Sequence, residues 1–169
     1  MKPNHEISHD LDNGYLFDDG ERIFSMRIKT FQAFLDRLSV IGGMPVSQVL
    51  WDQMGKAAGQ TAFSFWKDRI HSVEDLCKVG DEILSQHGCG RLLGIEKRVE
   101  GSTDRFIVRC KGTPLSYERK AAEPSCHFMR GLMQGWIEGY LERNAASSIE
   151  TKCEATGSSE CVFEVTFIQ

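Results

Sequence analysis

Apolar residues recur at helical spacing in four stretches of the chain. The first stretch runs from Met26 until the adjacent glycines Gly42-Gly43 stop it, and a second follows Pro45. The third opens with Ser72-Val73-Glu74-Asp75, a typical helix start, and stops before Gly88. The pattern predicts helices over Met26 to the glycine pair, Ser47 to Trp66, Ser72 to Gln86, and Cys126 to about Arg143.

Three pairs of strand-like segments flank turn residues and predict β-hairpins. They are Tyr15–Phe17 with Arg22–Phe24 around Asp18-Asp19-Gly20, Arg91–Val99 with Arg105–Cys110, and Ser147–Ala155 with Glu160–Ile168 around Thr156-Gly157-Ser158. Helices followed by two strand pairs with one helix between them indicate an α+β fold, with an antiparallel sheet of about four strands packed against a layer of helices. We expect residues 1–13 to be a flexible tail and residues 14–169 to form a single domain.

Composition narrows the class of protein. The 169 residues, 41% hydrophobic and 26% charged, are enough for one domain with a core. A formal net charge of −4 without a basic run disfavours direct contact with nucleic acid. We find neither a signal peptide nor an apolar run of membrane-spanning length, so we expect a cytoplasmic protein whose six cysteines are thiols or metal ligands.

Three of these cysteines and one glutamate form a candidate metal site. Pairing centred on Gly157 sets Cys153 opposite Cys161, and directly opposed residues have Cβ atoms about 4.5–5.5 Å apart. Cys126 opens a predicted helix, where the helix dipole favours the thiolate. Glu150 lies just upstream in Glu-x-x-Cys. These four ligands suit zinc, which prefers tetrahedral sulfur-rich sites.

Other interpretations of the same residues stay open. Free cysteines are often small buried hydrophobes, and two opposed cysteines in a hairpin can form a disulfide. Strand alternation sends Glu150 and Cys153 to opposite faces unless a bulge or a strand end intervenes. His127, the residue after Cys126, is therefore an alternative fourth ligand.

Glycines recur every four residues in the fourth predicted helix, at Gly131, Gly135 and Gly139. Gly55 and Gly59 repeat the spacing in the second helix. Each glycine costs about 1 kcal/mol relative to alanine inside a helix. Something must therefore approach these backbones closely, either another helix or a bound ligand, and two helices that touch along glycine faces can also enclose a pocket beside the contact.

The stretch from Cys126 to Gly135, Cys126-His-Phe-Met-Arg-Gly-Leu-Met-Gln-Gly135, followed by Glu150-x-x-Cys153 and Cys161-Val162-Phe163, resembles the 4-vinyl reductase domain family. This family includes hydrocarbon-binding proteins and the sensory domains of phenol- and xylene-responsive activators. It shares its fold, the NO-signalling and Golgi-transport fold, with TRAPP subunits. The resemblance extends to Asp19–Ile23 and to Met54–Gly59, so it covers nearly all of the chain after the tail.

The resemblance implies a zinc ion bound by residues at four matching positions, close to a pocket for an aromatic ligand. These positions are Cys126, Glu150, Cys153 and Cys161. Phenol sensors also carry a His and a Trp that hold the phenol hydroxyl, whereas an ungapped placement puts Gly90 and Arg109 nearest to those positions, which disfavours phenol itself. The 169 residues hold neither the ATPase nor the DNA-binding domain of those activators, so we expect action alone or through a separate regulatory protein.

Our leading hypothesis is a stand-alone binding or sensing domain for a small apolar or aromatic molecule, with zinc as a structural clasp. A closed four-ligand site leaves no position for substrate, so the metal is expected to stabilise rather than catalyse. Each aromatic residue at helical spacing is, taken alone, more often core than ligand wall. The candidate pocket residues are Trp51, Phe63, Phe106, Phe128, Leu132, Gly135, Trp136 and Tyr140.

Two other functions and one assembly state are also considered. Tetrapyrrole vinyl reduction, with His87 as an axial haem ligand, is the enzyme alternative, although no nucleotide-binding loop or catalytic triad is evident. A lipid-filled interaction scaffold like the TRAPP subunits is the third. We further expect a homodimer through Tyr15–Phe24 and the first helix, because that aromatic group is hard for a small domain to cover alone.

Overall fold

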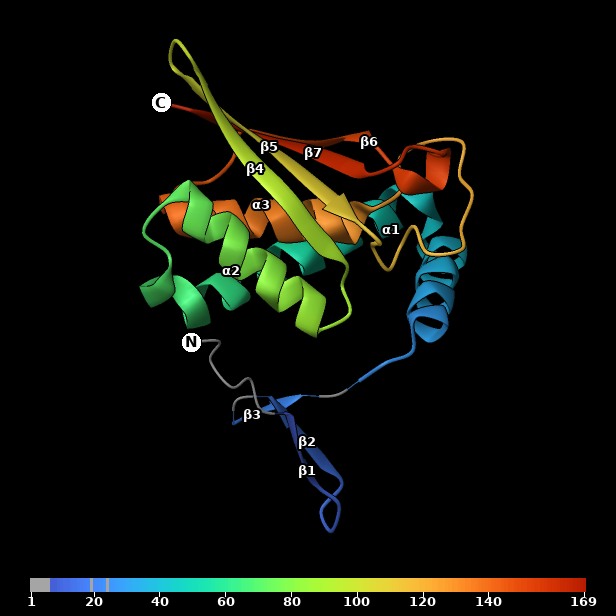
Figure 1. The fold of residues 1–169 in the computed structure, drawn as a ribbon. Helices are drawn as coiled ribbons and strands as arrows, with labels where there is room; N and C mark the ends of the chain where they lie inside the picture. Colours follow the sequence, from blue (N-terminus) through green and yellow to red (C-terminus); the bar gives the residue numbers. More distant parts are fainter. Residues whose placement is uncertain (1–6, 19, 24) are drawn as a thin grey trace.

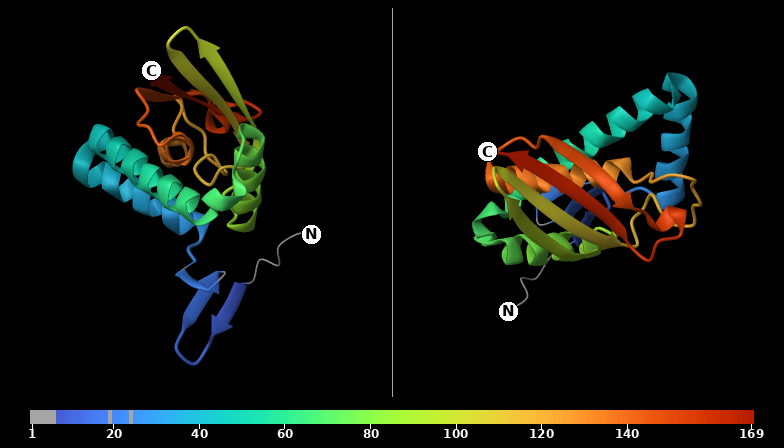
Figure 2. Two further views of the ribbon diagram at one scale, coloured as in Figure 1. Left: turned by 90° about the vertical axis from the view of Figure 1, so that its left-hand side faces the viewer. Right: turned by 90° about the horizontal axis from the view of Figure 1, so that it is seen from above.

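The computed structural model describes residues 7–18, 20–23 and 25–169 and has the expected α+β architecture. A four-stranded antiparallel sheet, in the order β4-β5-β7-β6, forms one layer, and helices cover one of its faces (Figure 1). Helix α3 (His127–Leu141) lies beneath the sheet, with α1 (Ile28–Trp66) packed along it and α2 (Val73–Gln86) beneath β4. Figure 2 shows α3 end-on between these two helices.

Helix α1 contains the break expected at the glycine pair. Gly43 has non-helical angles, φ 75° and ψ 161°, and Pro45 follows, so the segment consists of two helices with different directions. A 3₁₀ turn, η1 (Lys67–Arg69), ends it. Helix α2 starts where its cap predicts, because the Ser72 side chain accepts a 3.0 Å hydrogen bond from the backbone N–H of Asp75.

A separate three-stranded antiparallel sheet forms near the N-terminus from β1 (Ile7–Asp10), β2 (Tyr15–Asp18) and β3 (Glu21–Ile23). It projects from the rest of the protein (Figure 1). The expected β2–β3 hairpin is present, but β1 lies in the segment that we treated as a tail. The reason is a local turn, in which Asn13 donates backbone and side-chain hydrogen bonds to Asp10 at 3.1 and 2.9 Å. Residues 1–6, 19 and 24 lie outside the described residues.

The C-terminal strands follow the expected order with two differences in detail. Strands β4 (Arg91–Glu100) and β5 (Thr103–Lys111) are joined by a turn shorter than the expected five residues, with Gly101 at φ 61°. Strand β6 (Ser147–Lys152) pairs with β7 (Cys161–Ile168), and this ladder ends at Lys152 opposite Val162. Cys161 instead pairs with Cys110 of β5.

A 3₁₀ turn accounts for the second difference. The turn η2 (Glu154–Thr156), ended by Gly157 at φ 97°, takes the place of the simple three-residue loop. Cys153 therefore lies just beyond the last pair of the ladder rather than directly opposite Cys161 within it.

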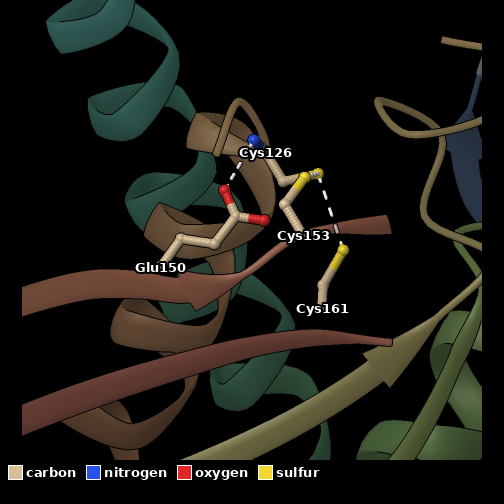
Figure 3. A group of neighbouring side chains, drawn as sticks. All are labelled: Cys126, Glu150, Cys153 and Cys161. Atoms are coloured by element: carbon tan, nitrogen blue, oxygen red, sulfur yellow. Dashed lines mark hydrogen bonds between the residues drawn. The ribbon is translucent and has the colours of Figure 1, made fainter. Parts of the chain in front are cut away.

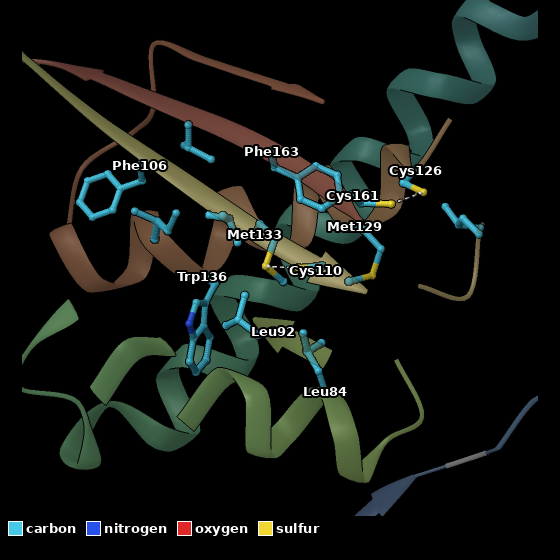
Figure 4. Packing of buried hydrophobic residues seen from close by; sticks show 14 of the residues in the cluster. Leu84, Leu92, Phe106, Cys110, Cys126, Met129, Met133, Trp136, Cys161 and Phe163 are labelled. Carbon is cyan, nitrogen blue, oxygen red and sulfur yellow. Dashed lines mark hydrogen bonds between the residues drawn. The ribbon is translucent and has the colours of Figure 1, made fainter. Parts of the chain in front are cut away.

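The core lies between α3 and the sheet (Figure 4). Phe106, Phe163 and Phe167 of the sheet and Met129 and Ile137 of α3 are fully buried. The rings of Phe106 and Phe167 meet edge to face at 5.8 Å. Among the described residues, no helix is long and apolar enough to cross a membrane.

The recurring glycines bring α1 and α3 into backbone contact. A Cβ atom on Gly55 would lie 2.0 Å from the carbonyl oxygen of Phe128, and one on Gly135 would lie 2.1 Å from that of Lys56. Gly59 and Gly131 have equally short distances, 2.2 and 2.0 Å, to carbonyl oxygens of the opposite helix. Close helix packing, rather than a ligand, therefore occupies this glycine face.

Candidate functional site

Cys126, Glu150, Cys153 and Cys161 come together at one end of the sheet (Figure 3). Cys126 is the residue before α3, Glu150 lies in β6, Cys153 follows β6, and Cys161 begins β7. One ligand atom from each lies within 4.8 Å of all the others. The Sγ atom of Cys126 is 3.7 Å from that of Cys153 and 3.8 Å from that of Cys161, and all six cysteines are free thiols.

A bulge in β6 brings Glu150 to the same side as Cys153. Glu150 is opposite Phe163 and Lys152 is opposite Val162, so Thr151 is an extra residue in the β6–β7 ladder. Residues three apart in a regular strand point to opposite faces, whereas one inserted residue restores the same face. The bulge thus removes the geometric objection to the carboxylate ligand.

The donor set fits a metal ion. Glu150 Oε2 accepts a 2.8 Å hydrogen bond from the backbone N–H of Cys126, which holds the carboxyl group over the sulfurs. Its other oxygen, Oε1, is buried and has no hydrogen-bond partner among the described residues. A buried oxygen without a donor beside three thiols is the arrangement that a cation satisfies. His127 is not part of this group, and burial lowers the pKa of its imidazole.

Without a cation, the three thiols share their protons unequally. A hydrogen bond from the Cys126 thiol lowers the pKa of Cys153 and correspondingly raises the pKa of Cys126. At Cys161 the bond with Cys126 lowers the pKa, but the bond with Cys153 and burial outweigh it and raise the pKa to about 12. Burial also raises the pKa of Glu150 to about 8. One thiolate is therefore favoured, and a divalent cation would bind with release of the remaining protons.

A second layer of polar groups contacts the sulfurs and was missed by our sequence reasoning. Thr113 Oγ1, fully buried, lies 3.3 Å from Cys126 Sγ and 3.9 Å from Cys161 Sγ. Ser116 Oγ lies 2.8 Å from Thr113 Oγ1 and donates a 2.9 Å hydrogen bond to Glu154 Oε2. The backbone N–H of Glu154 in turn donates to Cys161 Sγ at 3.4 Å. Thr113 and Ser116 lie in an irregular loop, so no spacing in the sequence connects them to the cysteines.

An apolar cavity of about 770 Å³ lies among α1, α2 and α3. Small side chains on one side of α1 leave the room for it, at Ala57, Ala58 and Ala62. Its wall is apolar apart from Asp18, Thr61, His87 and Cys89; the apolar lining residues are Ile23, Ala57, Ala58, Ala62, Phe65, Trp66, Gly80, Ile83, Leu84, Leu92, Phe128, Leu132, Met133 and Trp136. The alanines were a sequence signal that the search for aromatic residues overlooked.

Three of the eight candidate pocket residues, Phe128, Leu132 and Trp136, line this cavity. The other five lie elsewhere. Phe106 is fully buried in the sheet core and Gly135 contacts the backbone of Lys56. Phe63 packs against Gly139 and, at 5.7 Å, against the Trp136 ring, Tyr140 packs against the core, and Trp51 belongs to an aromatic group with Phe31, Phe34 and Phe128.

The polar part of the cavity wall connects the N-terminal sheet to α2. His87 Nε2 contacts Asp18 of β2, and His87 Nδ1 lies 2.8 Å from the carbonyl oxygen of Ile83. Both ring nitrogens thus have partners, which is unlike the free axial haem ligand that the enzyme alternative requires. Gly90 and Arg109 do not line the cavity, since Gly90 packs against the backbone of Lys111 and Arg109 pairs with Glu160 at 3.6 Å.

Comparison with known proteins supports the resemblance seen in the sequence. Residues 106–167 match the sequence model of the 4-vinyl reductase domain. No curated protein matches the chain in a sequence search. The phenol-responsive sensory domain of the transcription activator PoxR, solved with phenol, is similar in structure, with a TM-score of 0.78 and 15% identity over 95% of this chain and 84% of that chain.

Two further solved structures have the same fold at low identity. A vinyl-4-reductase family protein from Methanocaldococcus jannaschii gives a TM-score of 0.56 at 17% identity, covering 85% of this chain and 82% of that one. A trafficking protein particle complex subunit 3 from Naegleria fowleri, covalently bound to palmitic acid, gives 0.53 at 11% identity over 84% and 97%. The resemblance to the 4-vinyl reductase domain family is therefore confirmed, through a family match over residues 106–167 and a fold shared with the PoxR sensory domain, a vinyl-4-reductase family protein and a TRAPP subunit.

Proposed function

We propose that this chain is a binding and sensing domain for a small apolar or aromatic molecule, which it holds in the cavity among α1, α2 and α3. The observation that carries the proposal is the cavity of about 770 Å³ with its largely apolar wall. Ligand pockets of proteins commonly measure about 300–1,000 Å³ and combine apolar walls with few polar groups. We assign the domain to residues 14–169.

The ligand of the PoxR domain supports an aromatic molecule, but the wall here differs from a phenol site in the residues expected at the hydroxyl. The cavity offers Asp18, Thr61, His87 and Cys89 as polar groups instead. Because His87 already contacts Asp18, we propose a ligand whose binding energy comes mainly from burial of apolar surface.

A lipid-filled scaffold is the second candidate, and the size of the cavity favours it. The volume of about 770 Å³ exceeds what one aromatic ring occupies, so an acyl chain would also find room. The palmitic acid of the Naegleria fowleri protein is consistent with that chemistry in this fold. Native mass spectrometry of the purified protein distinguishes the candidates, because a small aromatic supports sensing and a fatty acyl chain supports the scaffold.

The cavity itself is tested by filling it. Ala58→Phe places a ring in the cavity, whereas Gln53→Phe adds the same ring at an exposed position of the same helix. The uncharged fluorescent probe N-phenyl-1-naphthylamine should bind the parent chain and Gln53→Phe alike and bind Ala58→Phe at least tenfold more weakly, a loss of about 1.4 kcal/mol. Equal binding to both variants, with unchanged thermal unfolding, would refute the proposal.

We also propose that the metal is zinc and that its role is structural. Three thiolates and one carboxylate close a tetrahedral site without an open position for a substrate. The four ligands join the start of α3 to β6 and β7, so the ion would fasten the helix layer to the sheet. Zinc content by elemental analysis of protein purified without chelator tests this assignment.

A homodimer is the proposed assembly. Helix α1 exposes apolar side chains that one copy leaves uncovered, namely Phe34, Val40, Ile41, Met44, Val46, Val49, Leu50 and Met54, each at least 46% exposed. Exposed apolar surface on this scale marks interaction sites. We propose that a second copy covers it together with the N-terminal sheet, and that a separate regulatory protein reads the state of the dimer. The free thiols support a cytoplasmic location.

A further inference from the structure

A second, smaller cavity of about 190 Å³ lies between the first part of α1 and the start of α3. Its wall differs from that of the apolar cavity because polar side chains dominate the residues that carry the argument, Asp36, Ser39, Ser47, Trp51, Arg119 and His127. It is also a separate space. Phe128 lines the apolar cavity, and its ring meets that of Trp51 at 6.5 Å on the side of the polar one.

Two polar atoms of this wall lack partners. The indole Nε1 of Trp51 has no hydrogen-bond partner among the described residues, although the side chain is only 3% exposed. The Nδ1 atom of His127 is likewise buried without a partner. Buried polar atoms in proteins are almost always hydrogen-bonded, and two exceptions in the wall of one small polar cavity indicate a ligand that supplies the partners.

The partnered groups of the wall define the charge of that ligand. The Arg119 guanidinium donates a 2.8 Å hydrogen bond to Asp36, so the cationic and the anionic group neutralise each other. The hydroxyl of Ser39 donates to that of Ser47 at 2.9 Å. The wall therefore offers donors and acceptors without net charge, and an unpaired ion would lose its hydration there without compensation.

We propose that this cavity is a binding site for a small uncharged molecule with a carbonyl oxygen, such as a carboxamide, that accepts a hydrogen bond from the indole N–H of Trp51. An indole N–H can only donate, so the ligand must carry an acceptor. Serine hydroxyls and the Asp36 carboxylate can accept from an amide N–H on the same ligand. The site lies beside the metal cluster through His127, the neighbour of Cys126, and does not depend on the apolar ligand.

The tryptophans of the chain provide the test, because Trp51 lines the polar cavity while Trp66 and Trp136 line the apolar one. In a ¹H–¹⁵N correlation spectrum of the zinc-loaded full chain, titration with propionamide should shift the Trp51 indole signal saturably and leave the other two in place. Propionate, its charged counterpart, should bind at least roughly tenfold more weakly. No saturable Trp51 shift at millimolar propionamide, or equal or tighter binding of propionate, would overturn the proposal.

Variants separate this site from the apolar cavity. Trp51→Phe keeps the ring and removes the N–H, so saturation transfer from the protein to propionamide should be lost, while Trp66→Phe should retain it. If Trp51→Phe fails to fold by circular dichroism, assigned signals of the parent chain still decide the question. Transfer that survives in a folded Trp51→Phe chain, or a shift confined to Trp66 and Trp136, would contradict the polar site without affecting the apolar one.

Discussion

The backbone N–H of Cys126 donates a 2.8 Å hydrogen bond to Glu150 Oε2, so the first turn of α3 and strand β6 are joined at the metal cluster even before a cation binds. This contact orients the carboxyl group, and its second oxygen is left buried without a partner among the described residues. Zinc bound there should therefore stabilise the whole fold, since metal binding free energy is also folding free energy.

The first prediction is that removing zinc destabilises the chain. If zinc is present at a thousand times its Kd, it stabilises the folded state by about 4 kcal/mol, and its removal should lower the Tm by about 8–16 °C for a chain of this size. Elemental analysis should find about one zinc per chain, and calorimetry with and without a chelator measures the difference. Cys153→Ser should abolish both the zinc and the chelator effect, whereas Cys89→Ser, at a cysteine outside the cluster, should preserve them.

The second prediction concerns Thr113, which acts through the sulfurs. Thr113→Val keeps the buried volume and removes the hydroxyl 3.3 Å from Cys126 Sγ. Loss of such an outer contact typically weakens metal affinity 10–100-fold. Competition with a chromophoric chelator measures the affinity, and the cobalt-substituted spectrum reports whether the ligands are unchanged. Thr166→Val, at a half-buried threonine of β7 away from the cluster, should bind zinc like the parent, and equal affinities of the two variants would refute the role of Thr113.

Sequence patterns were sufficient where one short-range rule controls the local structure. The Gly42-Gly43 stop, the Ser72 cap and the four members of the metal cluster are all of this kind. The strand β1 was missed because its polar residues owe their pairing to a turn between Asp10 and Asn13 rather than to hydrophobic alternation.

Other features depend on packing between distant segments, which spacing alone does not describe. The bulge at Thr151 is decided by the pairing of β6 with β7 and by the cluster that it serves. The glycines at 55 and 135 were recognised as points of close approach, but only the arrangement of α1 against α3 decides that a backbone fills the space. The cavity lies instead beside Ala58, where a small side chain carries no sequence signature of its own.

The third prediction concerns pH and the buried carboxylate of Glu138. Burial raises its pKa, but hydrogen bonds from Gln134, the backbone N–H of Ala145 and Lys56 together lower it below the ordinary value of 4.5. A depressed pKa contributes stability that is present above pH 4.5 and is lost as the pH falls through the lower folded value. Glu138→Gln should therefore lower the free energy of unfolding at pH 7 and flatten its decline below pH 4.5. Urea unfolding at several pH values tests this, and parallel pH profiles for the two chains would contradict it.

The fourth prediction is that the exposed face of α1 joins two copies. Ile41 is 82% exposed, and Ile41→Glu should convert the dimer into a monomer because it introduces a charge into an apolar interface. Val99→Glu changes an apolar residue that is 61% exposed on β4 and should leave the dimer intact. Sedimentation velocity at micromolar concentration measures both. A parent chain that sediments as a monomer would rule out the proposed assembly.

The fifth prediction contrasts two glycines of equal size and opposite surroundings. Gly135→Ala improves helix propensity by about 1 kcal/mol, but its Cβ atom would lie 2.1 Å from the carbonyl oxygen of Lys56, and backbone cannot yield as a side chain can. Separating α1 from α3 should cost more than the propensity returns, so we expect a net loss of about 2 kcal/mol or more in unfolding free energy.

Gly94→Ala is the control for that substitution, because a Cβ atom there meets nothing within 4 Å and the backbone is not in the left-handed region. Its unfolding free energy should stay within about 0.5 kcal/mol of the parent. Since α1 and α3 also form walls of the apolar cavity, the Gly135→Ala chain should take up the fluorescent probe differently, while Gly94→Ala should not. Equal stability of the two variants would mean that the helices can separate freely, and the glycine contact would then not hold the cavity in shape.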